Sequence, residues 1–249
     1  MRVTVSSLSV GDWWADTARI NRLPELTGAD GVELILEGSH QPSRFEPEEL
    51  SVEVDSVHAP FADVNFATPS EHHREYALDV LRRAAEVGVE LGARYVVVHP
   101  GHLTPVTVKD RDLALDFCIE TLREARKIVG KLGLTLAVEN MPDHEILLGT
   151  SPEEIAEIVR SSGCHFALDV GHALTCDGSP LPYLDELEPC VVHVHDNSGK
   201  KDEHRAPGDG ILRVEELKEV LERCELPVVE VKEVSDAREG VALVRELTR

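Results

Sequence analysis

The sequence predicts a single parallel eight-stranded (β/α)8 barrel, the TIM-barrel architecture, that takes in residues 1–249. Three observations lead to this prediction. Eight apolar strand-like runs recur along the chain, segments with helical periodicity lie between them, and no Pro- or Gly-rich linker divides the chain. The composition, 42% hydrophobic and 29% charged residues, is that of a globular protein. No stretch approaches the roughly 20 apolar residues of a membrane span, so no membrane partner is expected.

The predicted strands are rich in Val, Leu and Ile, as is typical of parallel strands that are buried on both faces. In chain order they cover residues 3–10, 31–36, 54–60, 95–101, 134–140, 165–172, 191–197 and 227–232. Parallel neighbours need right-handed crossovers, so a helix is expected outside the barrel after each strand. An open doubly wound sheet is the rival architecture. It is disfavoured because it would show fewer strands, and because the nucleotide-binding patterns GxGxxG and GxxxxGK are absent.

The helical segments differ in clarity. Apolar residues three and four positions apart mark helices at Glu71–Leu91 and Val108–Leu132. Ser151 is a cap ahead of Pro152 in the first turn of the next helix. Further helices begin at Arg213 and at Ser235, whereas residues 38–50 leave space for only a short helix in the second unit.

Charge and cysteine content narrow the classes of function. The formal net charge is −22, from 47 acidic and 25 basic residues. Nucleic-acid affinity comes largely from Lys and Arg, so this charge weighs against DNA, although a local basic groove or bound metals could still receive a phosphodiester. The five cysteines form no CxxC pair, so neither a disulfide framework nor a Cys-type zinc site is indicated. The N-terminus has no signal-peptide pattern, and a cytoplasmic location is expected.

Ligand-type side chains stand at the carboxyl ends of six consecutive predicted strands. They are His58, His99, Glu139, Asp169 with His172, His193 with His195, and Glu230, and the loop after the seventh strand adds Asp202 and His204. Active sites of (β/α)8 barrels are built at this end, so these side chains should converge. A mixture of His and carboxylates indicates a divalent metal, Zn, Mn, Mg or Co, without choosing among them. A single histidine of this kind is better explained as a buried residue bonded to a carbonyl. Glu139 and Glu230 are harder to explain as incidental buried residues, because carboxylates are seldom buried without a partner.

Other polar residues receive weaker expectations. Glu33 should point into the barrel or its rim and support a ligand. The histidines outside the strand ends, His40, His72, His73 and His144, are expected to be solvated. Lys200, Lys201 and Arg205 form either a solvated loop or a clamp for an anion or phosphate. Of Trp13 and Trp14, one is expected to pack inward over the mouth.

Six segments resemble the xylose isomerase-like TIM barrels. They are VHAPF (57–61), VVVHPG (96–101), AVENMP (137–142), ALDVGHA (167–173), the HxHDN pattern (193–197) and DEHRAPGDG (202–210). This superfamily unites sugar isomerases and epimerases with apurinic endonucleases of the endonuclease IV type. The resemblance extends from the second strand to the eighth and implies one of two chemistries.

The epimerase pattern implies one divalent ion held by Glu139, Asp169, Glu230 and either His193 or His195. The two glutamates would also act as the acid/base pair that moves a proton next to a carbonyl through an enediolate. His172 would bind a substrate oxygen, and His195, Lys201 and Arg205 are the other expected substrate contacts. The partner would be a small sugar or sugar phosphate.

The endonuclease IV pattern implies three zinc ions and a phosphodiester substrate. Its ligands would be His58, His99, Glu139, Asp169, His172, His193, Asp202, His204 and Glu230. All nine positions hold suitable residues, but the Leu-Asp-Thr-Cys-His run of that type reads LDVGH here. Together with the net charge, this favours isomerase or epimerase chemistry, with one to three ions and with nucleic acid as partner only under the alternative. A barrel that only binds a ligand is a third hypothesis, which the Glu139/Glu230 pair disfavours. The sequence leaves a homo-oligomer open.

Overall fold

Eight parallel strands close into a barrel in the structure, a computed structural model that describes residues 1–249. The strands are β1 (Thr4–Ser6), β2 (Gly31–Ile35), β3 (Val54–His58), β4 (Tyr95–Val98), β5 (Thr135–Glu139), β6 (His165–Asp169), β7 (Pro189–Val194) and β8 (Leu226–Val229). Each strand pairs with the next in the chain, and β8 returns to pair with β1 through two registered residue pairs. The predicted fold class is therefore confirmed.

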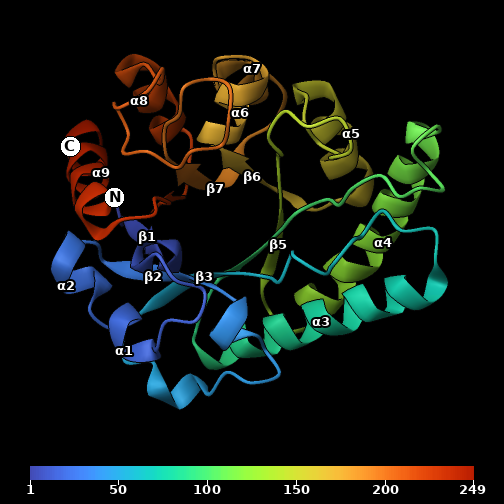
Figure 1. The fold of residues 1–249 in the computed structure, drawn as a ribbon, viewed down its shortest axis with the longest axis horizontal. Coiled ribbons are helices and arrows are strands. Elements are labelled where there is room, and N and C mark those ends of the chain that lie inside the picture. The colour runs from blue at the N-terminus through green and yellow to red at the C-terminus, as the bar shows by residue number, and fades with distance from the viewer.

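Helices surround this barrel (Figure 1). The predicted helices are present as α3 (Glu71–Glu90), α4 (Arg111–Lys131), α5 (Pro152–Ser162), α8 (Val214–Glu222) and α9 (Val234–Leu247). Four shorter helices, α1 (Thr17–Ile20), α2 (Leu23–Thr27), α6 (Val170–Cys176) and α7 (Leu181–Glu186), complete the set. Ser151 caps α5 as expected, since its hydroxyl accepts a hydrogen bond from the Glu154 N–H. No helix is both long and apolar enough to cross a membrane.

Several predicted boundaries are wrong, for local reasons. The first strand ends at Ser6, because the Ser6 hydroxyl caps the 3-10 helix η1 (Ser7–Val10). The second unit, expected to have only a short helix, has two 3-10 turns in line with that expectation, η2 (Gly38–His40) and η3 (Pro47–Glu49). The sixth strand ends at Asp169, whose side chain caps α6 by accepting from the His172 N–H at 2.6 Å. His172 therefore lies on a helix.

The barrel interior has an apolar layer below a polar one. A cluster of buried side chains fills its lower part: Tyr95, Val97, Ala137, Ala167, Cys190, Val191, Leu226 and Val228. Because side chains alternate along a strand, the inward residue after Ala137 is Glu139, and after Ala167 it is Asp169. The same step of two leads from Val191 to His193 and from Val228 to Glu230. The apolar layer thus closes the floor beneath the ligand-type residues.

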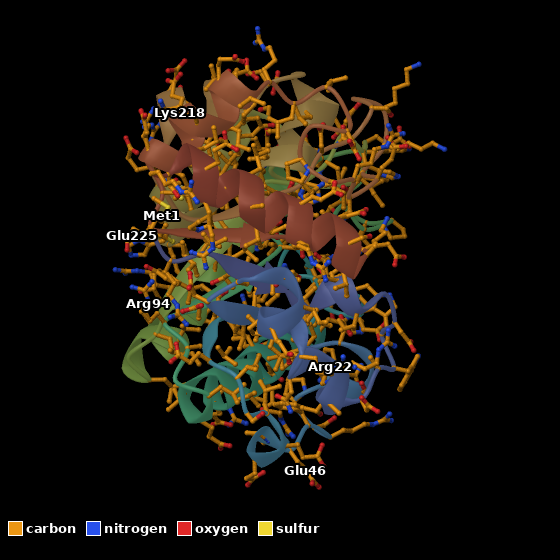
Figure 2. All side chains as sticks on the ribbon, turned by 90° about the vertical axis from the view of Figure 1, so that its left-hand side faces the viewer. Met1, Arg22, Glu46, Arg94, Lys218 and Glu225 are labelled. Atoms are coloured by element: carbon orange, nitrogen blue, oxygen red, sulfur yellow. The ribbon has the colours of Figure 1, made fainter.

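The two ends of the barrel are easily told apart in Figure 2. Met1, Arg94 and Glu225 each precede a strand, and they lie on the same side of the molecule. The carboxyl ends of the strands therefore face the opposite side. The first and last parts of the chain are joined by α2 and α9, where Arg238 and Arg245 donate to the carbonyls of Leu26 and Gly28.

Candidate metal centre

All nine predicted ligands meet at the carboxyl end of the barrel, and the central group is buried. Glu139, Asp169, His193 and Glu230 each place one ligand-type atom within 4.8 Å of the others. Nδ1 of His193 lies 2.8 Å from Glu139, 3.3 Å from Glu230 and 3.7 Å from Asp169. Three carboxylates around one imidazole form a site with surplus negative charge.

A second group shares Glu139 with the first. His58 Nε2 and His99 Nε2 lie 3.1 Å and 3.3 Å from Glu139 Oε2. His58 Nδ1 lies 2.9 Å from the Ala59 carbonyl, which can only accept, so Nδ1 carries the proton. In the neutral ring, Nε2 then presents its lone pair to the site, as a metal ligand must.

A third group is joined by Asp202. His204 Nε2 lies 2.9 Å and His172 Nε2 3.5 Å from Asp202 Oδ2. Nδ1 of His172 faces the Asn140 carbonyl at 2.8 Å, and Nδ1 of His204 faces the Glu230 carbonyl at 3.0 Å. Both rings thus have the same proton arrangement as His58. His204 is also the one non-glycine residue with positive φ, 54°, a conformation that often occurs at functional sites.

These neighbours shift the pKa values of the cluster strongly. Burial alone would raise the pKa of Glu139, but His193, His58 and His99 lower it well below its ordinary value. Burial would likewise lower the pKa of His172, yet Asp169, Asp202 and Glu139 raise it to about 10. Burial also opposes charge on His204, but Asp202 and Glu230 raise its pKa to about 9. Without another cation, the carboxylates therefore keep protons on these histidines.

The donor set fits divalent metal ions. Oδ1 of Asp202 and Nδ1 of His195 are buried without a hydrogen-bond partner. Buried polar atoms are normally satisfied, so such atoms beside a cluster of His and carboxylates fit a site that binds a cation. The residues placed to hold metal are eight of the nine predicted ones together with His195, while Asp202, the ninth, contacts His172 and His204.

Glu33 lies behind the central group, as expected. It is fully buried, its Oε1 is 2.9 Å from His193 Nε2, and its Oε2 accepts from the Ser56 hydroxyl at 2.6 Å. A carboxylate on the far nitrogen of a ligand histidine fixes the ring orientation and raises its basicity. The structure thus confirms the predicted direction of Glu33.

Two further supports were not predicted. Asn140 holds Asp169 through both backbone groups, accepting from its N–H at 2.7 Å and donating to its carbonyl at 3.0 Å. Asp196 does not face the metal cluster, but accepts from four backbone N–H groups, those of Asn197, Gly208, Gly210 and Leu212. Their positions directly after the strand-end residues Glu139 and His195 are the only sequence signal of these roles.

Of the four predicted substrate contacts, only His172 lines the cavity over the metal cluster. His172 lines the open cavity, whereas His195 is fully buried, with Nε2 at 3.0 and 3.1 Å from the two Asp169 oxygens. Its ring stacks on His204 and occupies the space that a side chain at Gly171 would need. Arg205 pairs with Glu203 at 2.6 Å, and neither Arg205 nor the exposed Lys201 lines the cavity.

The cavity over the metal cluster has a volume of about 250 Å³. Its polar walls are His58, His99, Glu139, His172, Asp202, His204, Glu230 and Lys232, and its apolar walls are Leu8, Trp13, Ile35 and Phe61. Trp13 packs edge-on against Phe61 and Trp14 is more exposed, in line with the expectation for this pair. The cavity can therefore take a small polar molecule with one apolar face.

Of the four histidines expected in solvent, His40 is buried, with 6% of its surface exposed. That expectation was wrong, because the turn η2 folds under the loop of residues 12–15 and packs the His40 ring against Phe45. His72, His73 and His144 are exposed as expected.

The sequence is similar to proteins with an assigned activity and to others without one. The chain is 32% identical to the uncharacterized protein MJ1311 of Methanocaldococcus jannaschii over 87% of this chain and 80% of that protein. It is 26% identical to fructoselysine 3-epimerase of Escherichia coli O157:H7, over 64% of this chain and 59% of the relative.

Solved structures agree with this relationship. A D-tagatose 3-epimerase-like protein superposes with a TM-score of 0.89 at 31% identity, covering 100% of this chain and 97% of the other. Endonuclease IV from Thermus thermophilus, at 22% identity and a TM-score of 0.72, covers 99% and 100% and shares the fold. Residues 22–247 match the family described as xylose isomerase-like TIM barrel. The chain is thus a member of the xylose isomerase-like TIM barrel family.

Proposed function

We propose that the chain is a divalent-metal-dependent isomerase or epimerase of a small sugar or sugar derivative. One observation carries this proposal: Glu139 and Glu230 both line the same small cavity and both belong to the central ligand group. Ligand pockets for drug-sized molecules span roughly 300–1,000 Å³. A cavity of about 250 Å³ therefore suits a substrate of monosaccharide size.

The two glutamates are suited to moving a proton between neighbouring carbons or between the two faces of one carbon. Such a pair needs one carboxylate that is ionised and accepts the substrate proton, and the surrounding histidines, which lower the pKa of Glu139, keep Glu139 in that form. The partner glutamate would return a proton to the substrate. Glu230 is oriented by the Ser6 hydroxyl, which donates to its Oε1 at 3.3 Å. A bound divalent ion would stabilise negative charge that develops on a substrate oxygen. His172 and His204 at the cavity wall would orient the remaining hydroxyls.

A second candidate, a zinc-dependent apurinic-site phosphodiesterase, is favoured by the other two ligand groups. His58 and His99 flank Glu139, and Asp202 joins His172 to His204, so the chain has more ligands than one ion needs. In-line displacement at phosphorus commonly uses more than one metal ion. Net charge −22 opposes this candidate, because DNA must approach an acidic protein.

Metal stoichiometry and substrate panels together test both candidates. Metal per chain would be measured by elemental analysis of protein purified without chelator, and again on Asp202→Ala and His204→Ala. Each protein would then be assayed on ketoses and their epimers and on an oligonucleotide with one abasic site. Epimerisation that persists in the two loop variants supports the first candidate. If the protein cleaves the abasic site, and the two loop variants lose this cleavage together with one metal ion, the phosphodiesterase replaces the epimerase as the proposed function.

A further inference from the structure

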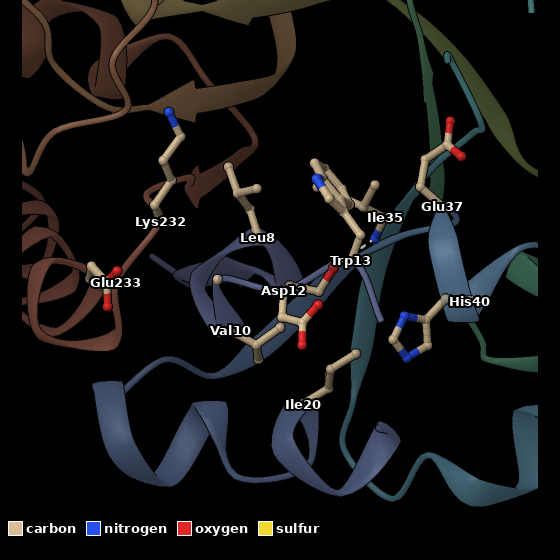
Figure 3. A pocket seen from close by; sticks show the side chains of 12 residues that line it. Leu8, Val10, Asp12, Trp13, Ile20, Ile35, Glu37, His40, Lys232 and Glu233 are labelled. Atoms are coloured by element: carbon tan, nitrogen blue, oxygen red, sulfur yellow. Dashed lines mark hydrogen bonds between the residues drawn. The ribbon is translucent and has the colours of Figure 1, made fainter. Parts of the chain in front are cut away.

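His195 is closed off from the substrate that it was expected to contact. Its side chain is fully buried, and it lines neither the cavity over the metal cluster nor the neighbouring cavity of about 260 Å³ that Figure 3 shows. A side chain that reaches no cavity cannot touch a substrate, so it acts through the residues around it. Two of these are Asp169, of the central ligand group, and His204, of the third group.

The first contact of His195 holds the carboxylate of Asp169. Nε2 of His195 lies 3.0 Å from Oδ1 and 3.1 Å from Oδ2 of Asp169. An ionised carboxylate only accepts, so Nε2 carries the hydrogen. The backbone N–H of His172 donates to Oδ1 at 2.6 Å, and Oδ2 is the oxygen that faces Nδ1 of His193, at 3.7 Å. The two donors therefore fix the rotation of the carboxylate and leave Oδ2 directed at the central group.

The second contact of His195 supports the ring of His204. The two rings stack with their centroids 4.1 Å apart and an angle of 16° between their planes. Nε2 of His204 faces Asp202 at 2.9 Å and its Nδ1 faces the Glu230 carbonyl at 3.0 Å, so a ring that turned off the stack would lose both partners. With φ at 54°, the His204 backbone has a conformation that persists only where the surroundings determine it. The His195 ring is one of those surroundings.

The same stack opposes a direct role for His195 as a ligand of the ion that His204 would bind. By distance alone, His195 belongs to two groups of possible ligands. The lone pair of an imidazole nitrogen lies in the plane of the ring, however, and lone pairs in two nearly parallel planes do not converge on one ion. His204 has the closer approach to Asp202, 2.9 Å against 3.8 Å for Nδ1 of His195. This geometry favours His204 as the ligand and His195 as its support.

We propose that His195 is a positioning residue that joins the central and third ligand groups. Its Nε2–H orients the Asp169 carboxylate, and the face of its ring holds His204. Residues that orient metal ligands in this way typically change metal affinity by about 10–100-fold. The inference concerns metal binding alone, so it holds or fails independently of whether the chain is an isomerase or a phosphodiesterase.

The donor role is tested with two substitutions in a His204→Ala background, where no stack exists. His195→Gln keeps an N–H donor at the ε position and loses the ring, whereas His195→Leu loses both. Each protein would be titrated with Co²⁺ and followed by calorimetry and visible absorption. We expect His195→Leu to bind Co²⁺ about 10–100-fold more weakly than the parent, and His195→Gln to recover the affinity. Unchanged affinity in His195→Leu, or affinity as low in His195→Gln as in His195→Leu, overturns the donor role.

The stacking role is tested in the chain that retains His204. There His195→Gln, which lacks the ring, should weaken one bound Co²⁺ by about tenfold or more, because the third group loses its support. His73→Gln, a change of an exposed histidine on α3, should leave every ion bound. Unchanged Co²⁺ stoichiometry and affinity in His195→Gln overturns the stacking role. Urea unfolding of each metal-free variant identifies any that do not fold, and if His195→Leu is one of them, the His195→Gln comparison still decides.

Discussion

At the residue scale, the site depends on two carboxylates in the barrel, Glu139, which the surrounding histidines keep ionised, and Glu230. Glu139 belongs to two ligand groups, and Glu230 lies in the central group while also lining the cavity. Loss of charge at either position should therefore affect chemistry more than folding.

Glu139→Gln and Glu230→Gln should each reduce kcat by roughly 10²–10⁴-fold, the usual contribution of general acid/base catalysis. The side chains keep their size, so the circular dichroism spectrum should be unchanged. Measuring kcat on the sugar identified by the panel checks this. Activity close to that of the unmodified protein in either variant would exclude the acid/base role.

Gly171 is a second residue whose identity is set by the site. A Cβ at this position would lie 1.9 to 2.5 Å from the fully buried His195 ring, which cannot move without leaving Asp169. Gly171→Ala should destabilise the fold by roughly 1–3 kcal/mol and reduce metal content. Urea unfolding and elemental analysis measure both effects.

Gly130→Ala is the matched control, because its Cβ would meet no atom within 4 Å and it lies inside α4. It should stabilise the protein by up to about 1 kcal/mol. Equal behaviour of the two variants would show that the close approach of His195 has no energetic weight.

At the element scale, the loop after β7 is held in place by one side chain. The Asp196 carboxylate accepts from four backbone N–H groups between residues 197 and 212. This loop carries Asp202 and His204, so a side chain outside the ligand set determines where two predicted ligands lie.

Asp196→Ala should lower the free energy of unfolding by roughly 2–4 kcal/mol, because several N–H groups lose a charged acceptor. It should also reduce the metal content, if Asp202 and His204 are ligands as predicted. Asp209→Ala, an exposed carboxylate in the same loop, serves as the control and should change neither quantity. Full metal content in Asp196→Ala would mean that the loop is positioned by other contacts.

At the scale of the whole molecule, metal binding and proton binding compete. The pKa values of His172 and His204 in the metal-free protein are raised to about 10 and about 9, from 6.5. A histidine must be neutral to bind metal, so binding at pH 7 should release protons, and metal affinity should rise as pH approaches 9.

The stability of the metal-free fold changes with pH in the opposite direction to the metal affinity. A raised histidine pKa contributes stability that is complete below pH 6.5 and is lost as pH rises toward 9 and 10. Metal-free protein should thus lose stability over this interval while zinc-loaded protein does not. Calorimetric titration of zinc in buffers of different ionisation enthalpy counts the released protons. A count of zero would show that the two histidines are not ligands.

The sequence predicted the barrel and the convergence of the strand-end side chains because both follow from regular repeats. Buried parallel strands are continuously apolar, and an interruption by Glu139 or His193 at the inward face is visible in one dimension. Features set by loop packing were missed: the burial of His40, the bonding of Asp196 to the backbone of its own loop, and the pairing of Arg205 with Glu203. Each depends on a neighbour that is brought near only by the tertiary fold. The change from strand to helix at Val170 was missed because apolar residues continue across it.

The pairing of β8 with β1 has a consequence for synthesis of the protein. The ring can close only when residues 226–229 have left the ribosome and met residues 4–6, which were made first. Glu230 follows β8 directly, so a nascent chain lacks one of the four predicted ligands of the central group until nearly all of the barrel has been translated. The metal centre is therefore assembled after translation of the barrel, when its first and last strands are joined.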